Sequence, residues 1–387
     1  MFANPCFLLA AVTLLVANPL LASEPPNPLA ALDGTMATSP DSWREHVRPG
    51  TLQLFRQQVY GERPLGKPDD FKAVVVSEDA KALDGIATRK EIEISYSGPG
   101  GKGRFPAVLF TPNAAKNPVP AFLLINFIAA DPALPGNLKG LWPVREIIGR
   151  GYATVTFNFN DVDPDRIDGF KDGVRAIYGK QPQAAGAWGA LSAWGWGASR
   201  VLDYLEKDKA IDAKHVAVIG HSRAGKAAVW CGAEDERFAM VISNNSGCGG
   251  AALARGKEGE RVANITTKFP YWFCENYQKY ANNEDNLPID QHQLLGLIAP
   301  RLLYVASATE DQWADPKAEF KSCVLAAPVY ALYGKKGLDA DTMPPTDQAI
   351  LGGSIGYHLR TGKHDLATGD WQHYMDFADK NWGKPGK

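Results

Sequence analysis

VAVIGHSRAGKAAVW, residues 216–230, is the stretch that decides which fold we expect of this chain. A short apolar run with β-branched residues ends at Gly220, and a helix-forming run begins at Lys226. The turn between them carries Ser222 at its apex and a second glycine, Gly225, on its helix side. A turn of this G-x-S-x-G type exposes its serine hydroxyl at the top of an α/β sheet, and its glycines let neighbouring backbone pass close by. The stretch therefore predicts a strand, an elbow and a helix, with Ser222 as a catalytic nucleophile; an ordinary turn serine is the alternative.

Apolar runs and helix-forming runs alternate on both sides of this elbow. We expect strands at residues 71–76, 91–96, 107–110, 121–127, 152–157, 216–219, 240–243 and 302–306, and helices at 48–60, 141–150, 187–206 and 370–381. The remaining long segments predict an extended leader at 23–45, an irregular excursion rich in Asp, Gly and Pro at 158–183, and an aromatic-rich insertion at 269–280. Strands that alternate with helices indicate a mostly parallel central sheet covered on both faces. We predict an α/β-hydrolase fold, a three-layer sandwich that binds ligands at the carboxyl ends of its strands.

The composition indicates a globular protein and excludes an electrostatic nucleic-acid binder. Of the 387 residues, 45% are apolar and 22% are charged, and the formal charge is −2. This balance offers no basic face for nucleic acid, and it suits a neutral or sugar-like substrate. Because no low-complexity linker or internal repeat divides the chain, we expect residues 23–387 to form one domain. We also expect a monomer.

The first 22 residues read as a signal peptide. An apolar run at residues 7–16 leads to a segment that ends at Ala22, where we expect cleavage, although no Lys or Arg precedes the run. The run is too short to form a membrane-spanning helix. We therefore predict a secreted or periplasmic protein without a membrane partner; a buried N-terminal helix is the alternative.

The cysteines of the chain permit disulfides but do not show whether any form. Cys6 would leave with the signal peptide, and four cysteines would remain, Cys231, Cys248, Cys274 and Cys323. An even number in an exported protein permits disulfides, but the spacing does not fix a pairing and matches no metal site. Buried free thiols are the alternative, especially for Cys231 on the helix after the elbow. We expect no metal and no organic cofactor.

A catalytic serine needs a base, and the base needs a third group to orient it. In α/β hydrolases an acid and then a histidine follow the serine along the chain. His364 lies in a polar, glycine-containing loop directly before the last helix, where a base could reach Ser222. His358 lies in an apolar run and is expected to be structural, and His373 lies inside the helix. We therefore predict His364 as the general base.

The acid is expected just after the strand at 302–306, where its carboxylate would meet the histidine ring. Three carboxylates compete there, Glu310, Asp311 and Asp315. Asp315 precedes a proline and resembles a helix cap. Asp311 is therefore the first choice, and a solvated acidic loop without a catalytic role is the alternative.

Several segments of the chain together resemble a known family. GHSRAGKAA, SGCGGAA, LPIDQHQLLGLIAPRLLYVASATEDQWADP and GKHDLATGDWQHYMDFAD are similar to the glucuronoyl esterases, carbohydrate esterase family 15, and above all to their bacterial branch. The early segment VRPGTLQLFRQQVYGERP fits the N-terminal part of the same family. The resemblance covers nearly all of the chain after residue 22, and it is much more specific than the elbow alone.

The resemblance implies roles for residues around the elbow. Ser222 matches the nucleophile, His364 the base, and Arg223 a residue that contributes to the oxyanion hole. Without the family, Arg223 could equally be the partner in a surface salt bridge. Lys226 matches a residue that hydrogen-bonds sugar hydroxyls. Trp313 matches an aromatic that lines the sugar site, and Glu260 matches a sugar contact of the bacterial branch.

The sequence departs from the family pattern at one acidic position. Many members carry a glutamate before the Ser-Gly that follows the strand after the elbow helix, and Asn245 stands there in this chain. An amide cannot supply the negative charge that stabilises an imidazolium, so this chain is expected to rely on Asp311. The cysteine that precedes the serine in fungal members is His221 here, so their disulfide near the catalytic histidine is expected to be absent.

The residues and the resemblance together predict a serine esterase that hydrolyses esters of (4-O-methyl-)glucuronic acid, as in links between glucuronoxylan and lignin alcohols. Its substrate partner would be a carbohydrate, and its mechanism would pass through an acyl-enzyme. Two alternatives remain, an esterase of the same fold that acts on acetylated xylan or another small ester, and a non-catalytic carbohydrate-binding protein.

Overall fold

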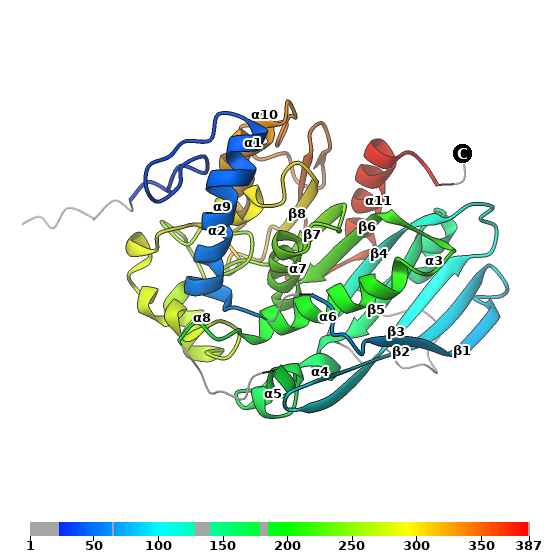
Figure 1. The fold of residues 1–387 in the computed structure, drawn as a ribbon. Coiled ribbons are helices and arrows are strands. Elements are labelled where there is room, and N and C mark those ends of the chain that lie inside the picture. Colours follow the sequence, from blue (N-terminus) through cyan, green and yellow to red (C-terminus); the bar gives the residue numbers. More distant parts are fainter. Residues whose placement is uncertain (1–22, 64–65, 128–139, 179–184, 386–387) are drawn as a thin grey trace, which may run out of the picture.

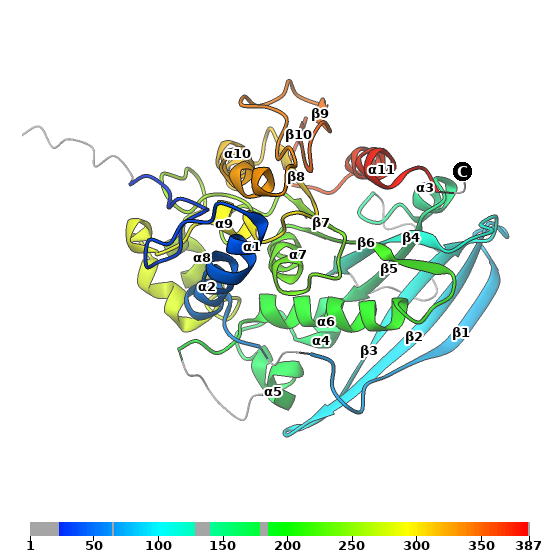
Figure 2. The same cartoon turned by 45° about the horizontal axis from the view of Figure 1, so that its top comes forward.

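A computed structural model describes residues 23–63, 66–127, 140–178 and 185–385. The predicted signal peptide, residues 1–22, lies outside the described residues. In the described part of the chain, a sheet of ten strands runs through the molecule in the order β1-β2-β3-β5-β4-β6-β7-β8-β10-β9 (Figure 1 and Figure 2). The strands are β1 (Lys72–Ala82), β2 (Ala87–Gly98), β3 (Gly101–Pro112), β4 (Val119–Asn126), β5 (Ala153–Asn158), β6 (Ile211–His221), β7 (Met240–Asn244), β8 (Leu302–Ala308), β9 (Ala349–Ile350) and β10 (Ile355–Arg360).

The middle of this sheet is parallel, as the alternation of strands and helices predicts. Strands β5, β4, β6, β7, β8 and β10 pair in parallel, while β1, β2 and β3 form an antiparallel extension at one end and β9 pairs antiparallel with β10 at the other. Because neighbouring parallel strands end at the same edge, the loops that follow β6, β7 and β8 gather on one side of the molecule. The elbow lies on that side, after β6.

Each face of the sheet carries its own hydrophobic core, because successive side chains of a strand point to opposite faces. In β6, Val216 and Val218 join one core, whereas Ala217 and Ile219 join the other. The first core packs against α2 (Arg48–Phe55), α6 (Ala190–Leu205), α7 (Arg223–Glu234), α9 (Gln291–Gly296) and α10 (Pro316–Leu332). The second packs against α3 (Val144–Gly149) and α11 (Thr368–Trp382), and Figure 2 shows the sheet between the two helical layers. The predicted three-layer α/β-hydrolase architecture is confirmed.

The N-terminal arm is more helical than the sequence predicted. The chain turns helical from Pro40, through α1 (Pro40–Ser42) and the π-helical turn η1 (Trp43–Val47), before α2 and a second π-helical turn, η2 (Arg56–Tyr60). Trp43 and Val47 are fully buried in the first core. The polar residues and prolines that suggested an extended leader therefore apply only as far as Ser39, where the Ser39 side chain caps the first turn.

Two further regions differ from the expected pattern. The excursion at 158–183 contains α4 (Phe159–Val162), a 3₁₀ turn η3 (Gly169–Lys171) and α5 (Val174–Tyr178), all shorter than the helices that periodicity reveals. Strand β10 was not predicted, although it completes the parallel sheet beside β8. Further short helices are α8 (Val262–Lys268), η4 (Glu275–Tyr280) and η5 (Glu284–Asn286).

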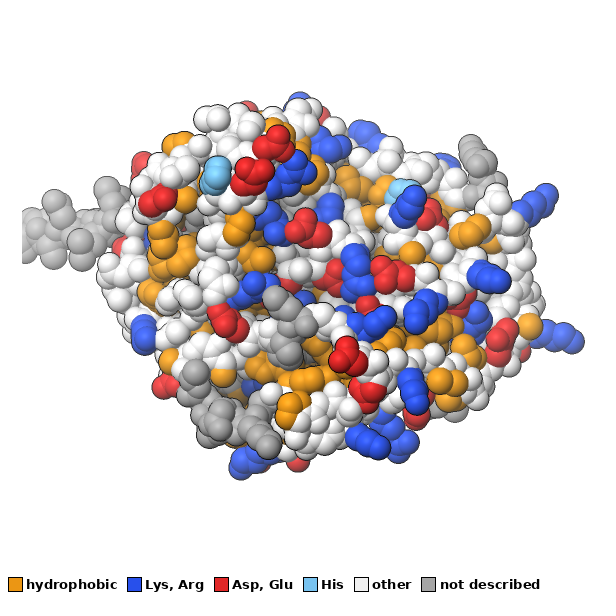
Figure 3. Space-filling view, viewed as in Figure 1, with side chains coloured by type: hydrophobic (Ala, Val, Ile, Leu, Met, Phe, Trp, Pro, Cys, Tyr) orange, Lys and Arg blue, Asp and Glu red, His pale blue; other side chains and the backbone are white. Residues whose placement is uncertain are grey.

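The surface agrees with the nearly neutral composition on the face that Figure 3 displays, where basic and acidic side chains are interspersed over the same regions. Among the described residues, no helix is both long and apolar enough to cross a membrane.

Candidate active site

Ser222 occupies a strained turn between β6 and α7. Its φ of +57° and ψ of −124° lie in a region that residues with a Cβ rarely adopt. The turn is possible because Gly220 carries no side chain: a Cβ there would lie 2.0 Å from the carbonyl oxygen of Ala224. Ala224 stands where the strict G-x-S-x-G pattern has its second glycine, and Gly225 follows one residue later. The Ser222 amide donates to the Asn244 carbonyl at the end of β7, 2.9 Å away, which ties the elbow to the neighbouring strand.

The structure brings His364 and Asp311 together, although 53 positions separate them in the chain. His364 lies in the loop between β10 and α11, and its Nδ1 is 2.6 Å from Oδ2 of Asp311, in the turn after β8. Asp311 is buried, while the His364 side chain is 42% exposed. The ring of His364 also lies 4.6 Å, centroid to centroid, from the ring of His221, which directly precedes Ser222. This contact places the imidazole beside the elbow.

Asn245 holds the same carboxylate from the other side. Its Nδ2 donates to Oδ2 of Asp311 at 2.9 Å, and its backbone adopts a left-handed φ of +47°. Burial raises the pKa of Asp311, but hydrogen bonds from His364 and Asn245 outweigh burial and leave the pKa below its ordinary value of 3.8. Asn245 thus supplies no charge of its own, yet it helps keep Asp311 ionised. Sequence reasoning noted the missing charge and did not anticipate the donated hydrogen bond.

His221, to which the sequence analysis gave no catalytic role, is a buried neighbour of Ser222 and His364. Its Nδ1 lies 2.6 Å from Oδ1 of Asn244, and the Asn244 amide group donates in turn to the hydroxyl of Tyr374 on α11. Burial, together with the neighbouring His364, lowers the pKa of His221 to about 4. His221 is therefore neutral near neutral pH, and its ring packs against the ring of His364 without adding a charge.

Arg223 is held by one carboxylate and two aromatic faces. Its guanidinium pairs with Asp165, which lies between α4 and η3 in the excursion. The guanidinium carbon lies 4.9 Å from the ring centre of Trp272 and 5.4 Å from that of Phe269, and the two rings stack on each other at 3.8 Å. Cation–π contacts of this kind attract a guanidinium to a fixed position. Asp165 escaped sequence reasoning because the excursion contains several aspartates and nothing in its pattern singles one out.

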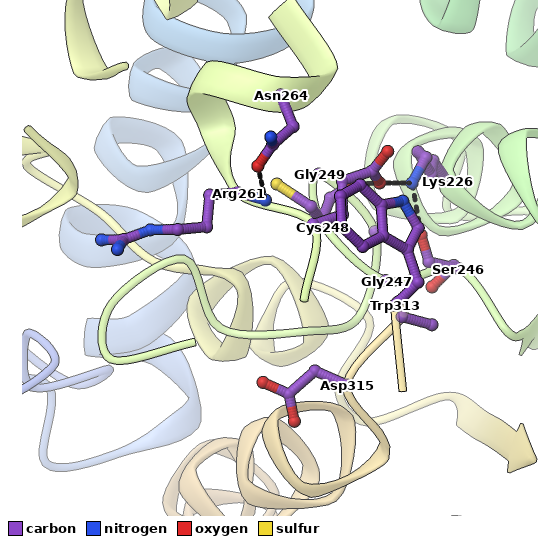
Figure 4. A network of polar contacts seen from close by, with 12 residues as sticks. Lys226, Ser246, Gly247, Cys248, Gly249, Arg261, Asn264, Trp313 and Asp315 are labelled. Atoms are coloured by element: carbon purple, nitrogen blue, oxygen red, sulfur yellow. Dashed lines mark hydrogen bonds and ion pairs between the residues drawn. The ribbon is translucent and has the colours of Figure 1, made fainter. Parts of the chain in front are cut away.

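Lys226 lies one turn further along α7, and its side chain is almost fully buried. Its Nζ donates to the carbonyl of Ser246 at 2.5 Å and to that of Cys248 at 2.7 Å, and it pairs with Glu260 at 3.5 Å. Figure 4 shows Lys226 beside Ser246 and Cys248, which lie in the loop after β7, with the Trp313 ring nearby. Trp313 is 56% exposed, and its carbonyl accepts a hydrogen bond from the Glu260 amide at 2.9 Å.

The competing acids, His358 and the cysteines that the sequence singled out lie outside the contact between His364 and Asp311. Asp315 caps α10 by accepting from the Ala318 amide at 3.0 Å, and His358 pairs with Asp370 at 2.7 Å inside the second core. Glu310, the third candidate acid, is not among the hydrogen-bond partners of His364 in the described chain. Cys231, Cys248, Cys274 and Cys323 are all buried free thiols. Within the described residues, no group of three or more His, Cys, Asp or Glu side chains is arranged to hold a metal ion.

Comparisons with known proteins point to one family. A family described as "Glucuronyl esterase, fungi" matches residues 94–334. Carbohydrate esterase MZ0003, from an unknown prokaryotic organism, is 40% identical over 92% of this chain and 88% of its own length. The solved structure of a glucuronoyl esterase from Solibacter usitatus is 41% identical, covers 94% of this chain and 99% of its own, and has a TM-score of 0.88. The 4-O-methyl-glucuronoyl methylesterase of Podospora anserina is 30% identical over 76% of this chain and 57% of its own length.

Proposed function

Because this chain belongs to the glucuronoyl esterase family and is a carboxylic ester hydrolase, we propose that its own Ser222, His364 and Asp311 cleave esters of (4-O-methyl-)glucuronic acid. The observation that carries the proposal is the contact between His364 and Asp311 beside a strained serine elbow. An ionised carboxylate that holds Nδ1 leaves Nε2 of the same ring free to accept the serine proton. The names of the relatives, 4-O-methyl-glucuronoyl methylesterase and glucuronoyl esterase, indicate which acid forms the acyl half of the ester.

In the proposed reaction, His364 takes the proton of Ser222 as the hydroxyl oxygen attacks the ester carbonyl carbon. The imidazolium that forms is stabilised by Asp311, which the hydrogen bond from Asn245 keeps ionised. The carbonyl oxygen becomes an oxyanion, and the Arg223 guanidinium with its backbone N–H stabilises that charge. The alcohol leaves with the proton from His364, and a water molecule that His364 deprotonates then releases the uronic acid from Ser222.

The sugar would lie on the side of the elbow where Lys226, Glu260 and Trp313 gather. Trp313 is 56% exposed and carries a ring that suits the apolar face of a pyranose, and Glu260 can accept hydrogen bonds from hydroxyl groups. Lys226 would contribute through any donor that its two carbonyl partners leave available. We further propose that residues 1–22 direct export and that residues 23–387 act as one monomeric domain on carbohydrate in lignocellulose.

Two measurements test the proposal. Purified protein should hydrolyse methyl glucuronate in preference to p-nitrophenyl acetate; preference for the acetate would favour a small-acyl esterase instead. Ser222→Ala and Asp311→Ala should each lower kcat by at least about 1,000-fold, as the loss of a triad member does. Hydrolysis unchanged in the serine variant would refute the catalytic assignment of Ser222, whereas a wild-type protein that binds glucuronate but hydrolyses neither ester would be a non-catalytic carbohydrate-binding protein.

A further inference from the structure

The carboxylate of Asp165 collects three donors from two distant parts of the chain. Its Oδ1 accepts from the Tyr271 hydroxyl at 2.9 Å and from Trp272 Nε1 at 2.7 Å, and its Oδ2 pairs with Arg223. The Asp165 side chain is 11% exposed. Burial and the nearby Asp165 raise the pKa of Tyr271 to about 12, so the tyrosine hydroxyl remains a donor to this carboxylate at neutral pH.

The segment around Asp165 is itself firmly attached to the core. The buried Asp163 binds Arg175 through both carboxylate oxygens, at 2.6 Å for the closest contact, and its backbone carbonyl accepts from Trp194 Nε1 at 2.8 Å. The Arg175 guanidinium also donates to the Tyr271 carbonyl at 3.3 Å. Asp165 therefore sits on a fixed support and can determine where the guanidinium of Arg223 lies.

The proposed reaction changes the charge of the ligand that lies beside Arg223. The substrate is a neutral ester, whereas the product is a uronate whose carboxylate forms where the ester carbonyl stood, and it is ionised at neutral pH. An unbalanced guanidinium at that point would bind a carboxylate through charge-assisted hydrogen bonds and would retain the product. Among the described residues, Asp165 is the carboxylate that pairs with Arg223, and it compensates the charge while leaving other N–H groups of the guanidinium free.

We propose that Asp165 is a positioning residue that fixes Arg223 for the oxyanion and, as its counter-charge, keeps the affinity of the site for the uronate product low. The inference rests on the proposed function, because it assumes that the acyl half of the ester is a uronic acid. Through this ion pair the site would discriminate between the neutral substrate and its charged product. A purely structural ion pair would not discriminate between a carboxylate ligand and its neutral amide.

The decisive experiment compares the binding of glucuronate and glucuronamide to wild-type protein and to Asp165→Asn by titration calorimetry. The variant keeps the shape of the side chain and removes its charge. We expect glucuronate to bind at least about twofold to threefold more tightly, the effect in water of removing one like charge about 7 Å away across the guanidinium, while glucuronamide binding stays the same. The gain should shrink as salt is added. Hydrolysis of methyl glucuronate should show a lower kcat and stronger inhibition by added glucuronate.

Two matched variants separate position from charge. Tyr271→Phe removes one hydrogen bond to Asp165 and leaves the charge, and Asp165→Glu keeps the charge and moves it. Both should lower kcat without tightening glucuronate binding. If Asp165→Asn does not fold, as judged by circular dichroism, Asp165→Ser provides the smaller neutral side chain for the same titration.

The outcomes distinguish this inference from the proposed function. A folded neutral variant that binds glucuronate no more tightly than wild type, or that binds glucuronamide equally more tightly, overturns the role of Asp165 while the esterase assignment stands. A wild-type protein that neither hydrolyses methyl glucuronate nor binds glucuronate overturns both.

Discussion

Arg223 and Lys226 lie one turn apart at the start of α7, yet the structure gives these two cations opposite surroundings. The Lys226 side chain is 6% exposed, and its ammonium group reaches two backbone carbonyls and one carboxylate. The Arg223 side chain is 36% exposed, and one carboxylate and two ring faces hold it. An ammonium group also has fewer N–H donors than a guanidinium. Lys226 therefore has most of its donors engaged by its own chain, whereas Arg223 keeps several for a ligand.

This difference leads us to expect that Lys226 holds the structure of the site, whereas Arg223 would take part in the proposed reaction. Lys226 joins the loop after β7 to Glu260, so we expect its first effect to be on the position of this backbone, beside the proposed sugar site. Arg223 has a partly exposed guanidinium directly after the proposed nucleophile, and we expect its first effect to be on the charge that develops in the reaction. Removing each cation should consequently change a different measured quantity.

The largest effect is expected from Arg223→Met. The variant should lose about 100- to 1,000-fold in kcat, as other oxyanion donors do, because no cation would face the tetrahedral intermediate. Its free energy of unfolding should fall by about 1 kcal/mol, less than for Lys226→Met, because Asp165 loses its counter-charge but keeps the hydrogen bonds from Tyr271 and Trp272. Kinetics on methyl glucuronate and urea unfolding would measure the two quantities. A large loss of stability would contradict the contrast drawn with Lys226.

Lys226→Met should show the reverse pattern. We expect the free energy of unfolding to fall by about 3 kcal/mol, because two buried carbonyls lose their donor and Glu260 loses its counter-charge. The loss in kcat should remain below about tenfold once the measurement is made at a temperature where the variant is folded. Denaturant unfolding beside Arg223→Met provides the matched comparison. A fully stable but inactive Lys226→Met variant would show that this lysine acts on the reaction directly.

Asn245→Ala extends the comparison to an uncharged donor. The variant should lower the free energy of unfolding by about 1.5 kcal/mol at neutral pH, since a hydrogen bond to an ionised carboxylate is lost. The hydrogen bonds lower the pKa of Asp311, so their contribution is complete above the ordinary value near 3.8 and disappears as the pH falls through the lower native value. Unfolding of both proteins from neutral to acidic pH would test this. A difference that grew on acidification would contradict the assignment.

The smallest effect is expected from Glu260→Gln. The Lys226 ammonium would keep its two carbonyl partners, and the ion pair, at 3.5 Å, is longer than a strong charge-assisted bond. We expect a loss of about 1 kcal/mol in unfolding free energy and a rise in KM for a glucuronate ester without a matching fall in kcat. Thermal unfolding and steady-state kinetics would measure both. An unchanged KM would place Glu260 outside the sugar site.

The sequence predicted the parallel sheet and the elbow well because both depend on local patterns. Val216 to Gly220 form an apolar run that ends at a glycine, and such a run is readable without knowledge of its partners. The order of serine, acid and histidine then restricted the search for a base to the C-terminal loops, where His364 lies against Asp311 in the structure.

The parts that could not be predicted depend on contacts between distant segments. Asp165 meets Arg223 only because a loop after β5 and an insertion after β7 pack against the start of α7. The hydrogen bond from Asn245 to Asp311 likewise joins the ends of two neighbouring strands. Strand β10 was missed because its residues read as a short apolar run, which fits a buried helix or a strand equally well.

The free cysteines have a practical consequence for handling the protein. In the described part of the chain, Cys231, Cys248, Cys274 and Cys323 are buried and unpaired, and burial raises the pKa of Cys231 to about 12. Thiol reagents attack the thiolate of an accessible cysteine, and these groups are neither ionised nor accessible. A chain that begins at Ser23 should therefore mature in a reducing cytoplasm without an oxidative folding system. A single cysteine introduced on its surface should accept a fluorescent or spin label with little background.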